Sequence, residues 1–294
     1  MTTLLHRRHA LMALSALCLG LASRRAGAAN NSGVAIPKLP TFTRDDPARH
    51  GLELAEYADR FDTGWTDVYS KAKMTLSTAD GQSITREITQ MALEGPQGNK
   101  SLIRFLAPAD IRGVTALVHE QANAPDDNWL YLPSSRRVRR ISGANRTASF
   151  QGTEFTYEDL SSLSIERYAW TFVRDGDAAG QPVFELDAKP KDPNSGYSRL
   201  HVYLHREHFR VERIDYYDLA GRHLKTLTGS NWQHPHERFW RPQKLDMYNQ
   251  QTHKRTLMDI EPLFLNVALY PKSDGSKRNG LTPEQFTKRA LEAG

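Results

Sequence analysis

Cysteine is nearly absent from this sequence of 294 residues, which contains only Cys18. That cysteine lies in an N-terminal segment, residues 1–28, that we predict is removed after export. A mature chain without cysteine has no disulfide bond and no thiol nucleophile. Burial of apolar surface must therefore hold the mature protein together, and a chain of this length can bury a sizeable core.

The sequence also lacks a long apolar run. The run over residues 10–22 is shorter than the about 20 residues that a membrane-spanning helix needs. Its basic start, its short apolar centre and the small residues that follow are typical of an export signal. We therefore predict a signal peptide over residues 1–28 and a single domain over residues 29–294. The Arg7-Arg8 pair leaves both the general secretory and the twin-arginine route open.

A strong net charge is missing from the predicted mature chain. The whole sequence has 39 Lys and Arg residues against 34 Asp and Glu residues. Four of these arginines belong to the predicted signal peptide, and their removal leaves 35 basic against 34 acidic residues. A nucleic-acid-binding surface needs a net basic field that attracts phosphates. We therefore expect no nucleic-acid partner.

Catalytic and metal-binding motifs are scarce as well. The sequence has no G-x-S-x-G elbow, no phosphate-binding glycine loop and no dinucleotide fingerprint. Ser70 and Lys73 match S-x-x-K by letters, but they lie in a strand pattern, whereas that chemistry needs the serine at a helix start. His201 and His205 would lie about 13 Å apart along a strand, too far to share one ion. We expect no enzyme activity, no cofactor and no metal.

What the sequence does contain is a long series of strand patterns. Apolar and polar residues alternate over residues 68–76, and the Asp80-Gly81 turn leads back into a partner strand over residues 83–93. A further turn is predicted at Asp175-Gly176. The other predicted strands cover residues 100–106, 115–120, 129–132, 169–174, 182–188, 199–205, 209–217, 223–229, 243–248 and 254–261.

Three helices are predicted beside these strands. Asp46 and Pro47 mark the start of an amphipathic helix, residues 157–163 form a short one, and Thr282-Pro283 opens the last. Antiparallel sheets of this size tend to curl, and helices or a ligand then cover the concave face. We therefore predict a mainly β (α+β) fold built on one strongly curved antiparallel sheet.

The most distinctive segment runs from residue 126 to residue 160. It reads DDNWLYLPSSRRVRRIS over residues 126–142 and SFQGTEFTYEDL over residues 149–160. A short aromatic strand ends at Pro133, because proline has no N–H for the strand ladder. Basic, aromatic and acidic residues then follow in that order.

Four arginines of this segment surround Val138. Along an extended strand Arg137 and Arg139 share one side, and Arg136 and Arg140 lie on the other. One set can therefore form ion pairs with the acidic residues of the segment, which are Glu154, Glu158 and Asp159. The other set then faces solvent, lipid headgroups or an acidic partner. Pairing with the acids is the interpretation that we favour.

Together with RFLAPADIRGVTAL over residues 104–117, this segment resembles the outer-membrane lipoprotein-sorting protein family. These are LolA-like periplasmic proteins, and the similar branch is associated with RND- and MMPL-type exporters. The resemblance implies an incomplete antiparallel β-barrel like that of LolA and LolB, with helices covering its mouth and an apolar cavity for acyl chains. It also implies a periplasmic location, no catalytic residues and an inner-membrane exporter as partner.

A carrier of this kind works by burial, because each methylene taken from water contributes ~0.8 kcal/mol. Core packing is the competing interpretation for the apolar residues that we assign to the cavity wall. These wall residues are Met74, Leu76, Ile103, Phe105, Trp129, Tyr131, Val202 and Leu204. The residues assigned to contact with a partner or a headgroup are Arg136, Arg137, Arg139, Arg140, Phe155, Tyr157 and Asp159.

We therefore predict a periplasmic carrier that binds lipid or lipoprotein acyl chains. It passes them between an inner-membrane exporter and the outer membrane, with transient membrane contact. The first alternative is a non-enzymatic structural or adaptor protein of an envelope transport complex, whose curved sheet is filled by its own side chains. A hydrolase acting on a lipid is the last alternative.

Overall fold

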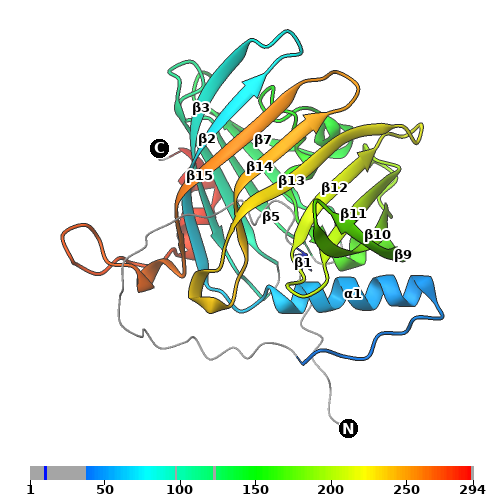
Figure 1. The fold of residues 1–294 in the computed structure, drawn as a ribbon. Coiled ribbons are helices and arrows are strands. Elements are labelled where there is room, and N and C mark those ends of the chain that lie inside the picture. The colour runs from blue at the N-terminus through cyan, green and yellow to red at the C-terminus, as the bar shows by residue number, and fades with distance from the viewer. Residues whose placement is uncertain (1–9, 12–37, 97, 122–123, 293–294) are drawn as a thin grey trace.

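The structure is a computed structural model that describes residues 10–11, 38–96, 98–121 and 124–292 (Figure 1). Most of the predicted signal peptide lies outside these residues, so its cleavage stays a prediction. The two residues of it that are described form β1 (Ala10–Leu11), which pairs antiparallel with β8 (Leu163–Ser164).

A single antiparallel sheet of 13 strands dominates the described part of the chain. Its strand order is β7-β6-β5-β4-β3-β2-β15-β14-β13-β12-β11-β10-β9, so nearly every strand pairs with its neighbour in sequence. The exception is the pairing of β2 with β15, which joins an N-terminal to a C-terminal meander. The sheet curves without closing, and β7 and β9 are its two edges (Figure 1). The predicted incomplete barrel is confirmed.

The strands have the following bounds. They are β2 (Asp67–Ser77), β3 (Ser83–Leu93), β4 (Lys100–Ala107), β5 (Thr115–His119), β6 (Asp127–Leu132), β7 (Arg137–Ile141), β9 (Tyr168–Ala178), β10 (Gln181–Pro190), β11 (Arg199–His205), β12 (Val211–Tyr217), β13 (His223–Gln233), β14 (Arg241–Asn249) and β15 (Arg255–Leu265). Every predicted strand is present: eight of the twelve are longer than predicted by one to five residues, two have the predicted bounds, and two are shorter by one or two residues.

The predicted turn at Asp175-Gly176 is wrong. β9 continues to Ala178, and the chain reverses at Ala179 and Gly180, which both have positive φ angles. Gly176 serves strand packing instead, because a Cβ atom there would lie 2.1 Å from Glu185 Oε1 on β10. A glycine inside a strand often marks a bulge or a site where another group approaches the backbone closely.

The helix α1 (Pro47–Phe61) begins as predicted. Asp46 is the N-cap, and its Oδ1 accepts hydrogen bonds from the backbone N–H groups of Ala48 and Arg49 at 3.0 and 3.1 Å. The helix lies across one end of the sheet, beside the edge strand β9 and below β9 to β12 in Figure 1. Gly51 permits this contact, because a Cβ atom there would lie 2.5 Å from the backbone nitrogen of Phe172.

The two faces of the sheet carry separate apolar clusters. The concave face, together with α1, forms the large cluster, which includes Met74, Phe105 and Leu204. A small cluster on the other face lies under the C-terminal turns η6 (Pro283–Phe286) and α2 (Lys288–Glu292), with Phe286 and Leu291 fully buried. Apolar residues therefore line both faces of the strands near β6.

Candidate functional site: the concave face of the sheet

One long connection crosses the open side of the sheet. β7 and β9 are consecutive strands of that sheet but form its opposite edges, so the chain between them must span the concave face. We call residues 142–167 the crossover segment. It contains η1 (Gly143–Thr147), η2 (Glu158–Leu160), β8 and η3 (Ile165–Arg167). The short helix predicted at residues 157–163 is thus only one 3-10 turn.

The crossover segment packs its aromatic side chains against the concave face. Phe150, Phe155, Tyr157 and Leu160 are buried in the same cluster as the inner residues of the strands. Phe150 lies 5.6 Å from Phe105 of β4, measured between ring centroids. The segment therefore occupies the space in which a bound acyl chain was expected.

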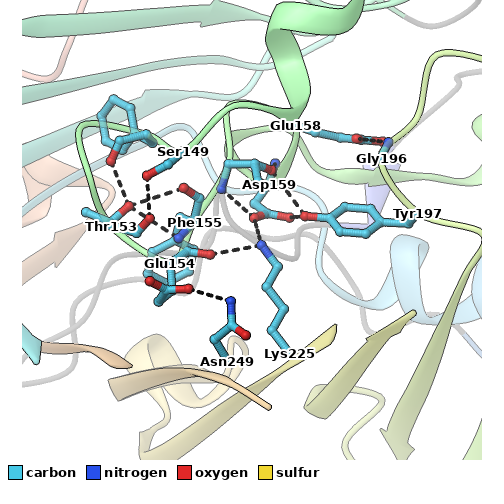
Figure 2. A network of polar contacts seen from close by, with 12 residues as sticks. Ser149, Thr153, Glu154, Phe155, Glu158, Asp159, Gly196, Tyr197, Lys225 and Asn249 are labelled. Carbon is cyan, nitrogen blue, oxygen red and sulfur yellow. Dashed lines mark hydrogen bonds and ion pairs between the residues drawn. The ribbon is translucent and has the colours of Figure 1, made fainter. Parts of the chain in front are cut away.

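A buried ion pair holds the crossover segment to the far half of the sheet (Figure 2). Lys225 Nζ of β13 donates to Asp159 Oδ2 at 2.5 Å and to the carbonyl oxygen of Glu154 at 2.9 Å. The side chains of Lys225 and Asp159 are 2% and 1% exposed. The hydroxyl of Tyr197 donates to Asp159 Oδ1 at 2.7 Å, so both carboxylate oxygens have partners.

Further hydrogen bonds surround this pair. Glu154 accepts from the Asn249 side chain at 2.7 Å, and its backbone N–H donates to Thr256 Oγ1 at 3.0 Å. Glu158 accepts from the hydroxyl of Ser195 at 2.6 Å and from the backbone N–H of Gly196 at 2.9 Å. Burial raises the pKa of Glu158 above its usual value, although these two hydrogen bonds oppose the shift. The crossover segment is therefore tied to β13, β14, β15 and the loop before β11.

Six of the eight predicted wall residues lie on the concave face. Five of them are buried in its cluster, and Ile103 packs against it partly exposed; the five are Met74, Leu76, Phe105, Val202 and Leu204. They form a contiguous apolar surface, but in this form the crossover segment and α1 cover it.

Trp129 and Tyr131 lie elsewhere, and their assignment to the wall is corrected. Trp129 pairs with Leu117 across β6 and β5, and both belong to the cluster on the outer face. Tyr131 packs against the same cluster, whereas Leu130 points to the concave side. The C-terminal turns cover this outer patch, so its residues are apolar for reasons unrelated to the concave face.

The favoured pairing of the arginines with the acids of the motif is wrong. Within the described residues, Arg136, Arg137 and Arg139 form no ion pair, and all three are exposed. Arg140 is also exposed and pairs with Asp127 on the adjacent strand. The alternation itself is as predicted, because Arg139 lies opposite Leu130 and Arg140 opposite Trp129. Glu154, Glu158 and Asp159 point inward and find other partners.

The assignment of Phe155, Tyr157 and Asp159 to partner or headgroup contact is also corrected. All three are buried, with Phe155 packed in the core and Asp159 bound to Lys225. They position the crossover segment. Of the seven residues assigned to such contact, the four arginines are the exposed ones.

Lys225 and Tyr197 were missed in the sequence. Lys225 has a recognisable pattern, because it occupies an inward position of β13, two residues before the buried Leu227. A charged residue at such a position needs a buried partner. Tyr197 lies in a loop and carries no comparable pattern.

The cavities between the described residues include two small ones on the concave side. One, of about 60 Å³, lies between the end of α1 and strands β12 to β14, and the other, of about 10 Å³, lies beneath Phe150 and Phe155. A cavity of about 150 Å³ holds one benzene molecule. Neither cavity can therefore hold an acyl chain unless the crossover segment moves.

The residues with defined positions include no group of three or more His, Cys, Asp and Glu side chains arranged to hold a metal ion. No helix within the described ranges is long and apolar enough to cross a membrane.

The architecture is that of a LolA-like protein. A crystal structure from Vibrio parahaemolyticus, provisionally named an outer membrane lipoprotein-sorting protein domain, is 37% identical and has a TM-score of 0.77, with 83% of this chain and 99% of that chain covered. The chain belongs to this outer membrane lipoprotein-sorting protein family. A family model described only as an uncharacterized protein also matches residues 97–293.

Two further structures share the fold. A DUF1329 family protein from Desulfovibrio piger is 27% identical with a TM-score of 0.74, over 84% of this chain and 99% of that chain. A LolA superfamily protein from Nitrosomonas europaea is 17% identical with a TM-score of 0.61, over 82% of this chain and 98% of that chain. No curated protein sequence matches the chain.

Proposed function

We propose that the protein is a non-enzymatic periplasmic carrier of lipid or lipoprotein acyl chains, and that its crossover segment takes the place of the passenger when none is bound. One observation carries the proposal: the apolar concave face is covered by α1 and by one connection between strands, the crossover segment, where a closed sandwich would have a second sheet. Family membership supports the same class of function.

The energies of such an exchange are balanced. Displacing the crossover segment breaks the buried Lys225–Asp159 pair and uncovers Phe150, Phe155 and Leu160, whose burial contributes about 1.5–3 kcal/mol each. A dozen methylenes entering the same face contribute about 10 kcal/mol, whereas four contribute only about 3 kcal/mol. Long acyl chains therefore displace the segment and short ones do not.

The exposed arginines of β7 are the part of the motif suited to contact outside the molecule. Arg137 and Arg139 lie on the concave side of an edge strand, beside the opening that the crossover segment spans. Arginine binds carboxylates and phosphates through its planar fork. We assign these residues to transient contact with anionic headgroups, or with an inner-membrane exporter of the RND or MMPL type, during transfer.

An adaptor protein of an envelope transport complex is the second candidate. The specific observation in its favour is the small volume, about 60 and 10 Å³, of the two cavities described on the concave face. In an adaptor the concave face stays filled, and the crossover segment is a permanent part of the core. The two functions therefore differ in whether that segment can be displaced.

A disulfide lock tests the difference. Glu154 N donates to Thr256 Oγ1 at 3.0 Å, so the two residues are in direct contact between the crossover segment and β15. The predicted mature chain has no cysteine, so Glu154→Cys/Thr256→Cys forms a bridge only between these positions. Binding of a fluorescent C16 fatty acid is measured for the oxidised and the reduced protein. The single variant Thr256→Cys under the same oxidant is the control.

For a carrier, the reduced double variant and the control bind the fatty acid, and oxidation abolishes binding in the double variant alone. Equal binding before and after oxidation would place the ligand away from the crossover segment. The adaptor function would be favoured if the wild type binds no fatty acid and native mass spectra of protein purified from its periplasm show no bound lipid.

A further inference from the structure

The larger cavity has a chemical character that the carrier function does not require. It lies on the concave side at the mouth, where the last turn of α1 faces β12, β13 and β14. Ile214, Leu227 and Leu245 connect its inner wall to the apolar cluster of the concave face. Its outer wall is built from two tryptophans and several arginines.

Arg210 is held between those two tryptophans. Its guanidinium carbon lies 4.5 Å from the ring centroid of Trp232 and 4.4 Å from that of Trp240. Its Nε donates to Glu212 Oε1 at 2.7 Å, and the other oxygen of Glu212 accepts from Trp232 Nε1 at 3.0 Å. The stack fixes the plane of the guanidinium, and within the described residues its two terminal nitrogens have no hydrogen-bond partner.

Arg241 adds a second incompletely paired cation to the same cavity. It is 2% exposed, and its Nη1 donates to Asp62 at 2.5 Å, whereas its Nη2 has no partner among the described residues. Buried N–H groups are almost always paired, so one without a partner points to a missing acceptor. Phe209, which lines the cavity, and Asn231, which precedes Trp232 in sequence, have left-handed backbone, with φ angles of 49° and 53°. Such strain concentrates at functional sites.

The histidines around the cavity contribute no charge at neutral pH. His234 and His208 lie 4.3 and 4.5 Å from Trp240, measured between ring centroids, and burial lowers the pKa of each. The pKa of the neighbouring His205 is lowered to about 4, also through burial. The arginines are therefore the cations that an anion meets here.

From this geometry we infer that the cavity is a headgroup subsite, in which Arg210 and Arg241 bind the oxyanion of an amphiphile whose hydrocarbon chain continues onto the concave face. The inference rests on the proposed carrier function and specifies the ligand as a lipid with a carboxylate or phosphate head. A volume of about 60 Å³ suits a head of this size, since a water molecule occupies about 30 Å³. A planar fork with free N–H groups is suited to both oxyanions.

The test compares three ligands with the same chain: dodecanoate, dodecyl phosphate and dodecanol. Binding is measured by calorimetry on the whole protein and on Arg210→Met. Arg210→Lys keeps the charge but loses the stacked fork, and it serves if the methionine variant does not fold. Arg222→Met is the matched control, because that exposed arginine forms its ion pair with Asp218, away from the cavity lining.

Whichever of dodecanoate and dodecyl phosphate binds the wild type more tightly should bind at least about 10-fold more tightly than dodecanol. Arg210→Met should weaken the binding of that anion by about 10- to 100-fold and leave the binding of dodecanol unchanged. Arg210→Lys should weaken binding of the anion less than Arg210→Met does. Arg222→Met should not change the binding of any of the three ligands. The subsite is refuted if dodecanol binds as tightly as both anions, or if the Arg210 variants bind the anions like the wild type. If none of the three ligands binds, the carrier function itself fails.

Discussion

The buried pair between Lys225 and Asp159 offers the sharpest test of how the crossover segment is held. Lys225→Met leaves a carboxylate that is 1% exposed and has lost its counter-charge. Removing one partner of a buried pair costs about 3–5 kcal/mol. That is a large share of the about 5–15 kcal/mol by which a domain is stable. The melting temperature should fall by about 6–20 °C, at about 2–4 °C for each kcal/mol.

A double-mutant cycle separates the ion pair from the packing around it. Asp159→Asn keeps the shape and removes the charge, so Lys225→Met/Asp159→Asn should cost less than the two single changes together, by about 1–3 kcal/mol. Lys244→Met is the matched control, because Lys244 pairs with Asp259 at 3.3 Å with both side chains over a third exposed. It should cost less than about 1 kcal/mol.

Urea unfolding gives the free energy of unfolding for each variant. The reasoning is refuted if Lys225→Met costs no more than Lys244→Met, or if the double change costs the full sum of the single ones. A second measurement concerns function. Because Lys225→Met has already lost part of the energy that holds the crossover segment, the folded variant should bind a C16 fatty acid more tightly than the wild type.

Three other predictions follow from single features. Gly51→Ala should destabilise the protein by about 1–3 kcal/mol in urea unfolding despite alanine's better helix propensity, because its Cβ atom meets the backbone of β9; no loss would contradict that packing. Burial, followed by the nearby Asp62, raises the pKa of Asp59 to about 8 from 3.8, so its contribution to stability is present below about pH 4 and lost as the pH rises to 8. Asp59→Asn should therefore be more stable than the wild type at pH 8, by at most about 5 kcal/mol, with the advantage vanishing near pH 4; equal melting curves at pH 8 would count against it. Arg137→Glu/Arg139→Glu should leave the melting temperature within about 2 °C and weaken binding to anionic vesicles, whereas a large loss of stability would reveal internal pairing.

The strands were predictable from the sequence because two local rules agree along most of the chain. Alternation marks one buried face, and Gly- or Asp-containing turns set the register, as between β2 and β3. The face assignment failed at β6, where Trp129, Leu130 and Tyr131 are apolar in succession. A strand covered on both faces has no period of two, so the sequence cannot say which residues point toward the concave side.

The prediction that the arginines of the motif pair with its acidic residues was wrong for a different reason. Arg137 and Asp159 are near each other in sequence, but the chain turns inward after β7 and carries the acid across the sheet. The partner of Asp159 is Lys225, 66 residues away, on a strand of the other meander. The contact between Lys225 and Asp159 depends on the order of the strands in the sheet. Local sequence patterns do not predict the order of strands that are distant in sequence.

The crossover segment also explains how the concave face can exist without a passenger. Exposed apolar patches above a few hundred Å² are rare in soluble proteins, so an empty apolar face must be covered or collapse. The segment is anchored at Ile141 and Tyr168, on the two edge strands, and such a tether lowers the entropy cost of covering the face. In the proposed carrier, the same tether keeps the displaced segment close, so that it competes with a bound acyl chain at high effective concentration. In the proposed carrier, affinity for an acyl chain depends both on the buried apolar side chains of the crossover segment and on the polar contacts of Glu154, Glu158 and Asp159, because the chain must replace both to enter.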